Sequence, residues 1–207
     1  MQFGYCERLS GDFWAEPINA VTNGAFLIAA ALALSSWRRG DKAVAALIAL
    51  VFAIGIGSFL FHTMPQRWTL LADVVPIQLF AFGYFALALR RFLAWSPIAV
   101  MVGTLSFLGF AFGLQAGLAP LLPARMRGSA GYAAFLLALI GMALACARRH
   151  PAVAGLLGSA AAAFALSLTL RSLDPVLCEA VPFGLHGGWH LLNALVLWLL
   201  LRAASRA

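Results

Sequence analysis

Seven apolar stretches, each long enough to cross a bilayer, dominate this chain of 207 residues. A helix needs about 20 apolar residues to span the hydrocarbon core. Helix is the only open-chain option there, because backbone polar groups must pair within their own segment. The predicted spans are residues 17–37, 43–63, 69–89, 92–113, 129–147, 152–170 and 186–201. Because the breaks between them are short, we predict a single all-α domain over residues 1–207, built as an up-and-down bundle of seven transmembrane helices.

The composition excludes several other classes of protein. Hydrophobic residues make up 63% of the chain and charged residues only 10%, whereas a soluble domain is nearer 25% charged. A cytosolic enzyme, a disordered chain and a soluble nucleic-acid binder are therefore excluded, although the net charge is +7. The expected partners are the lipid bilayer and a membrane lipid, and no nucleic acid. Three cysteines are too few for a disulfide scaffold.

The charged residues predict an orientation. Alternating spans place nine Lys and Arg residues with one acid on one side, and five Arg with six acids on the other. Because cytoplasmic loops carry the excess of Lys and Arg, we expect the N-terminus outside and the C-terminus in the cytoplasm. Residues 1–16 hold three acids and one arginine, unlike the basic start of a signal peptide. We therefore expect a short, mature extracytoplasmic segment there.

Three histidines fall at the same depth, near the outer side. His62 closes the second span, while His186 and His190 open the seventh. Positions four apart lie on one helix face, so His186 and His190 can coordinate one metal ion. His62 would complete three protein ligands, and the open fourth position would hold water, as in catalytic zinc sites. The fourth histidine, His150, lies in a cytoplasmic turn and is given no role.

Two polar residues adjoin the three histidines. Ser58 lies one turn before His62, and Asp73 lies early in the third span, where an ionisable group is costly and usually faces a partner or cavity. Asp73 could act as general base and then general acid on a metal-bound water. Two alternatives stay open: a receptor or transporter with structural zinc, and a membrane protein with a bis-histidine haem. A retinal protein is excluded, because the only lysine, Lys42, lies in a cytoplasmic turn.

At these residues the chain resembles the alkaline ceramidases, within the seven-span hydrolase superfamily that also includes the adiponectin receptors. The matching runs cover nearly the whole chain in the family's order. They are AEPINAVTN at 15–23, GSFLFH at 57–62, Asp73, LDPVLCE at 173–179 and HGGWH at 186–190.

The resemblance implies a site and a reaction. His62, His186 and His190 would hold zinc, Asp73 would transfer protons, and Ser58 would hydrogen-bond the developing oxyanion. The family hydrolyses the amide of ceramides, so we expect an N-acyl lipid to yield a sphingoid base or other amine and a free fatty acid. The Arg-rich, Ala-rich composition suggests a bacterial inner-membrane protein whose site faces the periplasm.

The resemblance also implies a disulfide between Cys6 and Cys178, both expected on the oxidising side. Eukaryotic relatives hold calcium through a run at the N-terminus and a glutamate at the first span. Here only Glu7 and Glu16 match those charged ligands, while Gly4 and Leu9 offer no side-chain oxygen. Glu7 and Glu16 are thus the candidate calcium ligands; alternatively, they pair with Arg8 or cap the first helix.

Overall fold

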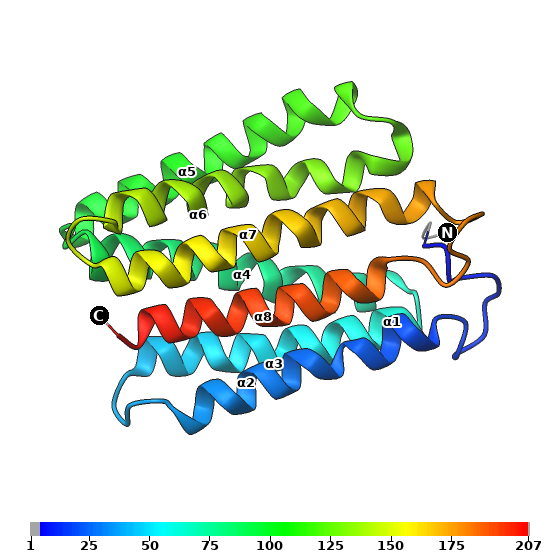
Figure 1. The fold of residues 1–207 in the computed structure, drawn as a ribbon, viewed down its shortest axis with the longest axis horizontal. Coiled ribbons are helices and arrows are strands. Elements are labelled where there is room, and N and C mark those ends of the chain that lie inside the picture. Colours follow the sequence, from blue (N-terminus) through cyan, green and yellow to red (C-terminus); the bar gives the residue numbers. More distant parts are fainter. Residues whose placement is uncertain (1–4, 207) are drawn as a thin grey trace.

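A computed structural model describes residues 5–206 of the chain; residues 1–4 of the predicted N-terminal segment, Gly4 among them, and Ala207 lie outside the described residues. The described part is an all-helical bundle (Figure 1). Its α-helices are α1 (Pro17–Thr22), α2 (Gly24–Ser35), α3 (Lys42–Thr63), α4 (Arg67–Phe92), α5 (Pro97–Leu118), α6 (Ala133–Cys146), α7 (Pro151–Leu173) and α8 (His186–Ala204). Three short 3₁₀ helices are η1 (Ala119–Leu121), η2 (Ala124–Tyr132) and η3 (Asp174–Val176).

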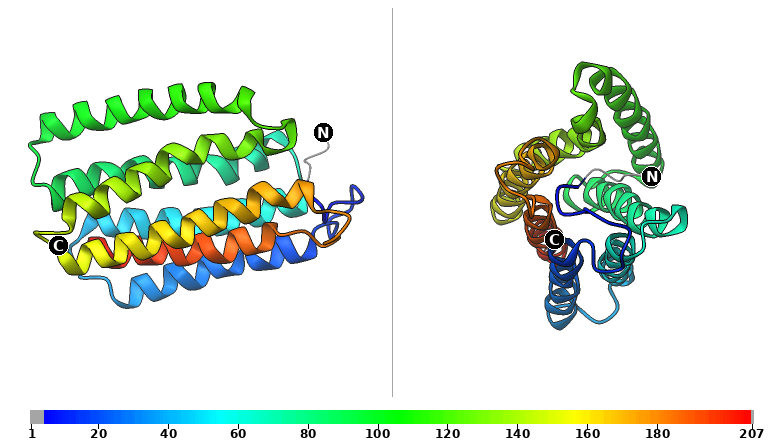
Figure 2. Two further views of the ribbon diagram at one scale, coloured as in Figure 1. Left: turned by 45° about the horizontal axis from the view of Figure 1, so that its top comes forward. Right: turned by 90° about the vertical axis from the view of Figure 1, so that its right-hand side faces the viewer.

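Seven helical segments of the described chain are long and apolar enough to cross a membrane, which confirms the predicted all-α class and the number of spans. The protein is therefore an integral, multi-pass membrane protein. Successive helices run up and down and pack side by side, with α5 and α2 on opposite edges of the bundle (Figures 1 and 2).

The predicted start of the fourth span was wrong. Residues 92–96, expected to begin that span, form the end of α4 and a turn, because the Ser96 hydroxyl accepts from the Ala99 amide and Pro97 fixes the first helical position. The first predicted span is confirmed as one membrane-crossing segment, Pro17–Ser35, within which Asn23 separates α1 from α2.

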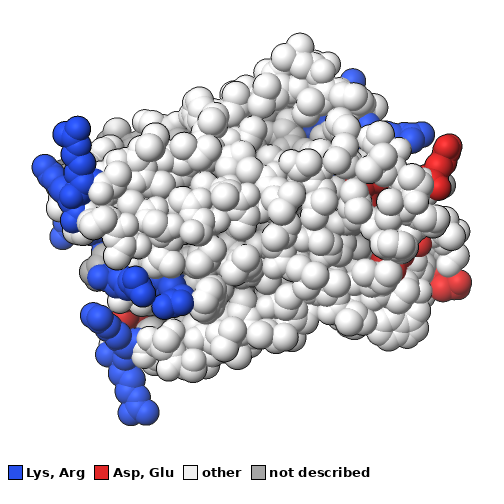
Figure 3. Space-filling view, in the orientation of Figure 1, with Lys and Arg blue, Asp and Glu red and all other residues white. Residues whose placement is uncertain are grey.

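The two ends of the bundle differ in charge. Lys and Arg gather at one end and the visible Asp and Glu mainly at the other (Figure 3). The histidines expected at one depth all lie at the acidic end, because α3 arrives there and α8 starts there. The sequence therefore brings the candidate ligands together through the alternating direction of its helices.

One glycine allows the closest helix approach near that end. A Cβ atom on Gly57 would lie 2.0 Å from the Ala72 carbonyl oxygen. The missing side chain lets α3 and α4 meet where Ser58 follows Gly57 and Asp73 follows Ala72. This contact positions both polar residues on facing surfaces.

Candidate metal centre

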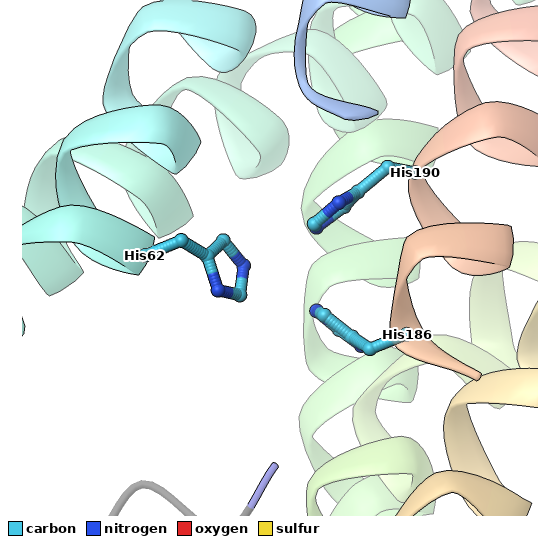
Figure 4. A group of neighbouring side chains, drawn as sticks. All are labelled: His62, His186 and His190. Atoms are coloured by element: carbon cyan, nitrogen blue, oxygen red, sulfur yellow. The ribbon is translucent and has the colours of Figure 1, made fainter. Parts of the chain in front are cut away.

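Three histidines from α3 and α8 point toward one another (Figure 4). One ligand atom from each of His62, His186 and His190 lies within 4.8 Å of the other two. Their ring centroids are 4.6 to 5.2 Å apart. All three side chains are buried. Within residues 5–206, no other group of three His, Cys, Asp or Glu residues has this arrangement.

The unpaired nitrogens of the group fit a metal ion. His62 Nε2 and His186 Nδ1 are buried, and neither has a hydrogen-bond partner among the described residues. Buried polar atoms are normally satisfied, so each such nitrogen calls for an explanation. Converging imidazole lone pairs from three rings suit zinc, whereas a bis-histidine haem would use only two of these histidines. The site therefore favours a small ion over the haem alternative.

The Nδ1 atom of His62 is held by a carboxylate. It lies 2.5 Å from Glu16 Oε2, and Glu16 is itself 1% exposed. Burial disfavours the charged form of Glu16, but the hydrogen bond from His62, with help from Asn19 and Arg8, holds its pKa below the usual value. The ionised carboxylate accepts the Nδ1 proton of His62. The Nε2 lone pair is therefore free for a metal.

A hydroxyl orients His190 in the same way. Thr22 Oγ1 lies 2.9 Å from His190 Nδ1. The Thr22 hydroxyl donates its proton to the Ile18 carbonyl oxygen, 2.7 Å away, so it accepts from His190. Gly187 permits this contact, because a Cβ there would lie 3.0 Å from an Ile18 methyl group and 3.4 Å from the Thr22 methyl group.

Arg8 completes the support of His62. Its Nε atom is paired with Glu16, and its guanidinium also donates to the His62 carbonyl oxygen at 2.7 Å. The Arg8 side chain is only 7% exposed. One arginine thus joins the N-terminal segment, the start of α1 and the end of α3 around the candidate metal ligand His62.

The two candidate calcium ligands have other partners. Glu7 accepts hydrogen bonds from the Ile18 and Asn19 amides, at 2.6 and 2.8 Å, and so caps α1. Glu16 is engaged by Arg8 and His62. The structure therefore gives calcium no support and confirms the alternative, in which one glutamate caps the first helix and the other pairs with Arg8.

Ser58 and Asp73 lie together beside the histidines. Both line the cavity that contains His186 and His190. Ser58 is buried there, so its hydroxyl and the Asp73 carboxyl meet the same enclosed space.

A disulfide ties the N-terminal segment to the loop before α8. Cys6 and Cys178 are bonded, as the resemblance implied, and Cys146 is free and buried. Asp174 adds a second tie, since its Oδ1 accepts from the Leu185 and His186 amides at 2.6 and 3.0 Å. Asp174 therefore caps the start of α8 and fixes the backbone of His186.

Two neighbouring hollows share lining residues, and the polar one contains His186 and His190. The polar cavity measures about 720 Å³ and is lined by His186, His190, Asp73 and Arg171 among others. A smaller, apolar hollow of about 120 Å³ runs further into the bundle. Tyr132 and Trp189 line both. This arrangement can hold an amphiphile, with its polar part beside the histidines.

Sequence reasoning missed four residues that build this centre. Thr22, Arg171 and the capping role of Asp174 carried no distinctive spacing, and Arg8 entered only as a partner for the glutamates. Two of the family runs were the available signals: AEPINAVTN at 15–23 contained Thr22, and LDPVLCE at 173–179 contained Asp174.

Comparison with known proteins points the same way as the geometry. The model of the ceramidase family matches residues 3–205, nearly the whole chain. A search of curated proteins returned no match. The family match covers the histidines, Asp73, both bridged cysteines and every described helix, so this chain belongs to the ceramidase family.

Proposed function

We propose that this protein is a membrane-embedded, zinc-dependent amidase that hydrolyses ceramide or a similar N-acyl lipid. Water would cleave the amide bond and release a sphingoid base or other amine and a free fatty acid. The observation that carries the proposal is a buried group of three histidines with unpartnered nitrogens, beside an aspartate, in a member of the ceramidase family.

His62, His186 and His190 would hold the metal. When bound, zinc polarises the amide carbonyl and brings the pKa of a coordinated water toward about 7. Glu16 and Thr22 support this role by fixing the tautomers of His62 and His190. Such outer partners commonly change metal affinity by about 10- to 100-fold when removed.

Asp73 would move the protons of the reaction. Its carboxylate would accept a proton from the attacking water and return it to the amide nitrogen, so that the amine leaves in a protonated form. Ser58 would donate its hydroxyl proton to the developing oxyanion. This division is supported by the cavity lining, since Ser58 and Asp73 line the same cavity as His186 and His190.

The lipid would bind across the two hollows. The apolar hollow among Phe80, Phe85 and Leu139 suits an alkyl chain, and the polar cavity suits the amide. Because the site lies between membrane-spanning helices near one membrane face, the substrate would enter it sideways from the bilayer.

Release of fatty acid from ceramide in mixed micelles tests this function. Asp73→Asn should lose about 10³-fold in kcat while retaining zinc, measured by metal analysis of the same preparation. Ser58→Ala should lose about 10²-fold. Retention of wild-type turnover by Asp73→Asn would remove Asp73 from the mechanism, and absence of zinc from the purified wild type would refute the metal assignment.

We also infer that the histidine end faces the periplasm of a bacterial inner membrane, with the N-terminal segment outside and the C-terminus inside. The support is the basic character of the opposite end, since cytoplasmic ends carry Lys and Arg (Figure 3). After mild reduction, Cys178 in spheroplasts should react with a membrane-impermeant maleimide. Labelling only after lysis would reverse the orientation.

A further inference from the structure

Arg171 is a cation turned into the bundle instead of toward the membrane surface. It lies in the last turn of α7. An arginine near the end of a span commonly extends to the polar interface. Here the guanidinium carbon instead lies 4.9 Å from the centre of the Trp189 ring and 5.2 Å from that of Tyr132. Both rings line the cavity beside the histidines, as Arg171 does.

Arg171 forms no close ion pair in the described chain. Within residues 5–206, no Asp or Glu oxygen lies within 4 Å of its guanidinium. The phenol of Tyr5 lines the same cavity and is a polar neighbour of Arg171, as is Asp73. Aromatic faces and a neutral hydroxyl stabilise the cation without cancelling its charge.

The cavity as a whole carries an excess of positive charge. Its charged lining residues are Arg8, Arg125, Arg171 and Asp73. Arg8 is neutralised by Glu16. Arg125 is exposed and donates to the Pro175 carbonyl oxygen at 3.3 Å, so it too keeps its charge. Two uncompensated guanidinium groups therefore face one carboxylate, and that carboxylate is the proposed proton carrier.

The position of Arg171 indicates which part of a substrate it would meet. Its two aromatic neighbours, Tyr132 and Trp189, stand where the apolar hollow joins the polar cavity. Trp189 in turn stacks near the ligand His186, with ring centroids 6.4 Å apart. An acyl chain in the apolar hollow would place the amide at the histidines. The group attached to the amide nitrogen would then extend into the polar cavity, toward Arg171.

We propose that Arg171 forms an anion-binding subsite, so that the preferred substrate is an N-acyl lipid with a carboxylate or similar anionic group close to its amide nitrogen. The inference rests on the proposed amidase function and gives it a substrate class. A planar guanidinium can hold a carboxylate through two parallel hydrogen bonds in a cavity sheltered from bulk water. Arg125, nearer the surface, would attract the anion as it enters.

A matched pair of probes tests the subsite. N-palmitoylserine and N-palmitoylserinol have the same acyl amide and differ only in carboxylate against hydroxymethyl. The wild type should hydrolyse the serine amide with at least about tenfold higher kcat/KM. Arg171→Met should lose about 100-fold on the serine amide, mainly through KM, because a charge-assisted hydrogen bond to a sheltered ion is removed. Its loss on the serinol amide should stay below about threefold.

Two further variants make the test specific. Arg127→Met is the control, since Arg127 carries the same charge in η2, is exposed and does not line the cavity. It should behave as the wild type on both amides. Arg171→Lys retains the positive charge but lacks the planar guanidinium with its two parallel donors. Compared with Arg171→Met, it should therefore show part of the wild-type preference for the serine amide.

The outcomes separate the subsite from the proposed function. If the wild type hydrolyses the serinol amide in preference to the serine amide, the anion-binding subsite is refuted while the proposed amidase function is still supported. Equal losses on both amides in Arg171→Met overturn it as well. If the wild type hydrolyses ceramide but neither probe amide, the subsite is overturned and the amidase function stands. If it hydrolyses none of the three, the amidase function fails and calorimetric binding of the two amides decides: tighter binding of the serine amide, abolished in Arg171→Met, upholds the subsite, and equal binding refutes it.

Discussion

The two ends of this bundle use the same pair of groups for different purposes. At the histidine end, Arg8 and Glu16 are 7% and 1% exposed, and the carboxylate also holds His62. At the opposite end, Arg91 and Asp41 are each 21% exposed. Arg91 donates twice to Asp41, at 2.9 and 3.1 Å, and once to the Ala204 carbonyl oxygen at 2.7 Å.

The two pairs differ in the second role of the carboxylate, besides its ion pair with arginine. Asp41 caps α3 through the Val44 amide, so its pair fastens the start of α3, the end of α4 and the end of α8. Glu16 instead fixes a candidate metal ligand. A buried ion pair adds little net stability but is costly to break by removing one partner, whereas a partly exposed pair contributes little either way. We therefore expect the buried pair to be the vulnerable one.

Removing the arginine from each pair should give the largest contrast. Arg8→Met leaves the Glu16 carboxylate buried without its cation and should cost about 3–5 kcal/mol of unfolding free energy. Arg91→Met should cost only about 1 kcal/mol. Unfolding by SDS in mixed micelles measures both variants. Equal losses would show that burial does not distinguish the two pairs.

The disulfide at the histidine end gives the next largest effect. Reduction of the Cys6–Cys178 bond should lower the unfolding free energy by about 2–4 kcal/mol, because the N-terminal segment is no longer held at the loop before α8. Dithiothreitol should therefore destabilise the wild type. A Cys6→Ser, Cys178→Ser double variant is the control, and it should not respond to the reductant; a response there would place the effect elsewhere.

Loss of the Glu16 charge should weaken metal binding more than folding. Glu16→Gln keeps the shape but offers His62 a neutral acceptor, so zinc affinity should fall by about 10- to 100-fold in a competition titration with a chelator. Asp41→Asn, the equivalent change at the other end, should leave zinc affinity unchanged. A similar loss in both variants would mean that Glu16 acts only through stability.

The fold was largely predictable because hydropathy over about 20 residues is a strong signal. The depth of His62, His186 and His190 followed from the direction of each span. The boundary at residues 92–96 failed because a long apolar run masked the helix-start signal of Ser96 and Pro97.

The support of the site was much less predictable. Glu16 reaches His62 only because the N-terminal segment folds back across the end of the bundle, 46 residues from its partner in sequence. No periodicity marks such a contact. Arg171 entered the sequence analysis only as one charge near the outer side, since nothing in its neighbours indicates whether it turns toward Trp189 or toward solvent. The disulfide came from family resemblance alone.

The smallest effect concerns acid stability at the end opposite the histidines. The hydrogen bond from Arg91 holds the pKa of Asp41 below its usual value, against the opposing effect of burial. Because the folded-state pKa is the lower one, the stabilisation is complete above the unfolded pKa of about 3.9 and is lost as the pH falls through the folded-state value. Asp41→Asn retains a capping oxygen but not the charge, so it should cost about 0.5–1 kcal/mol at pH 7 and clearly less near pH 3. Unfolding at the two pH values measures this difference, and the same change in an Arg91→Met background should have little effect at either. A cost that is the same at both pH values would show that Asp41 does not act through its charge.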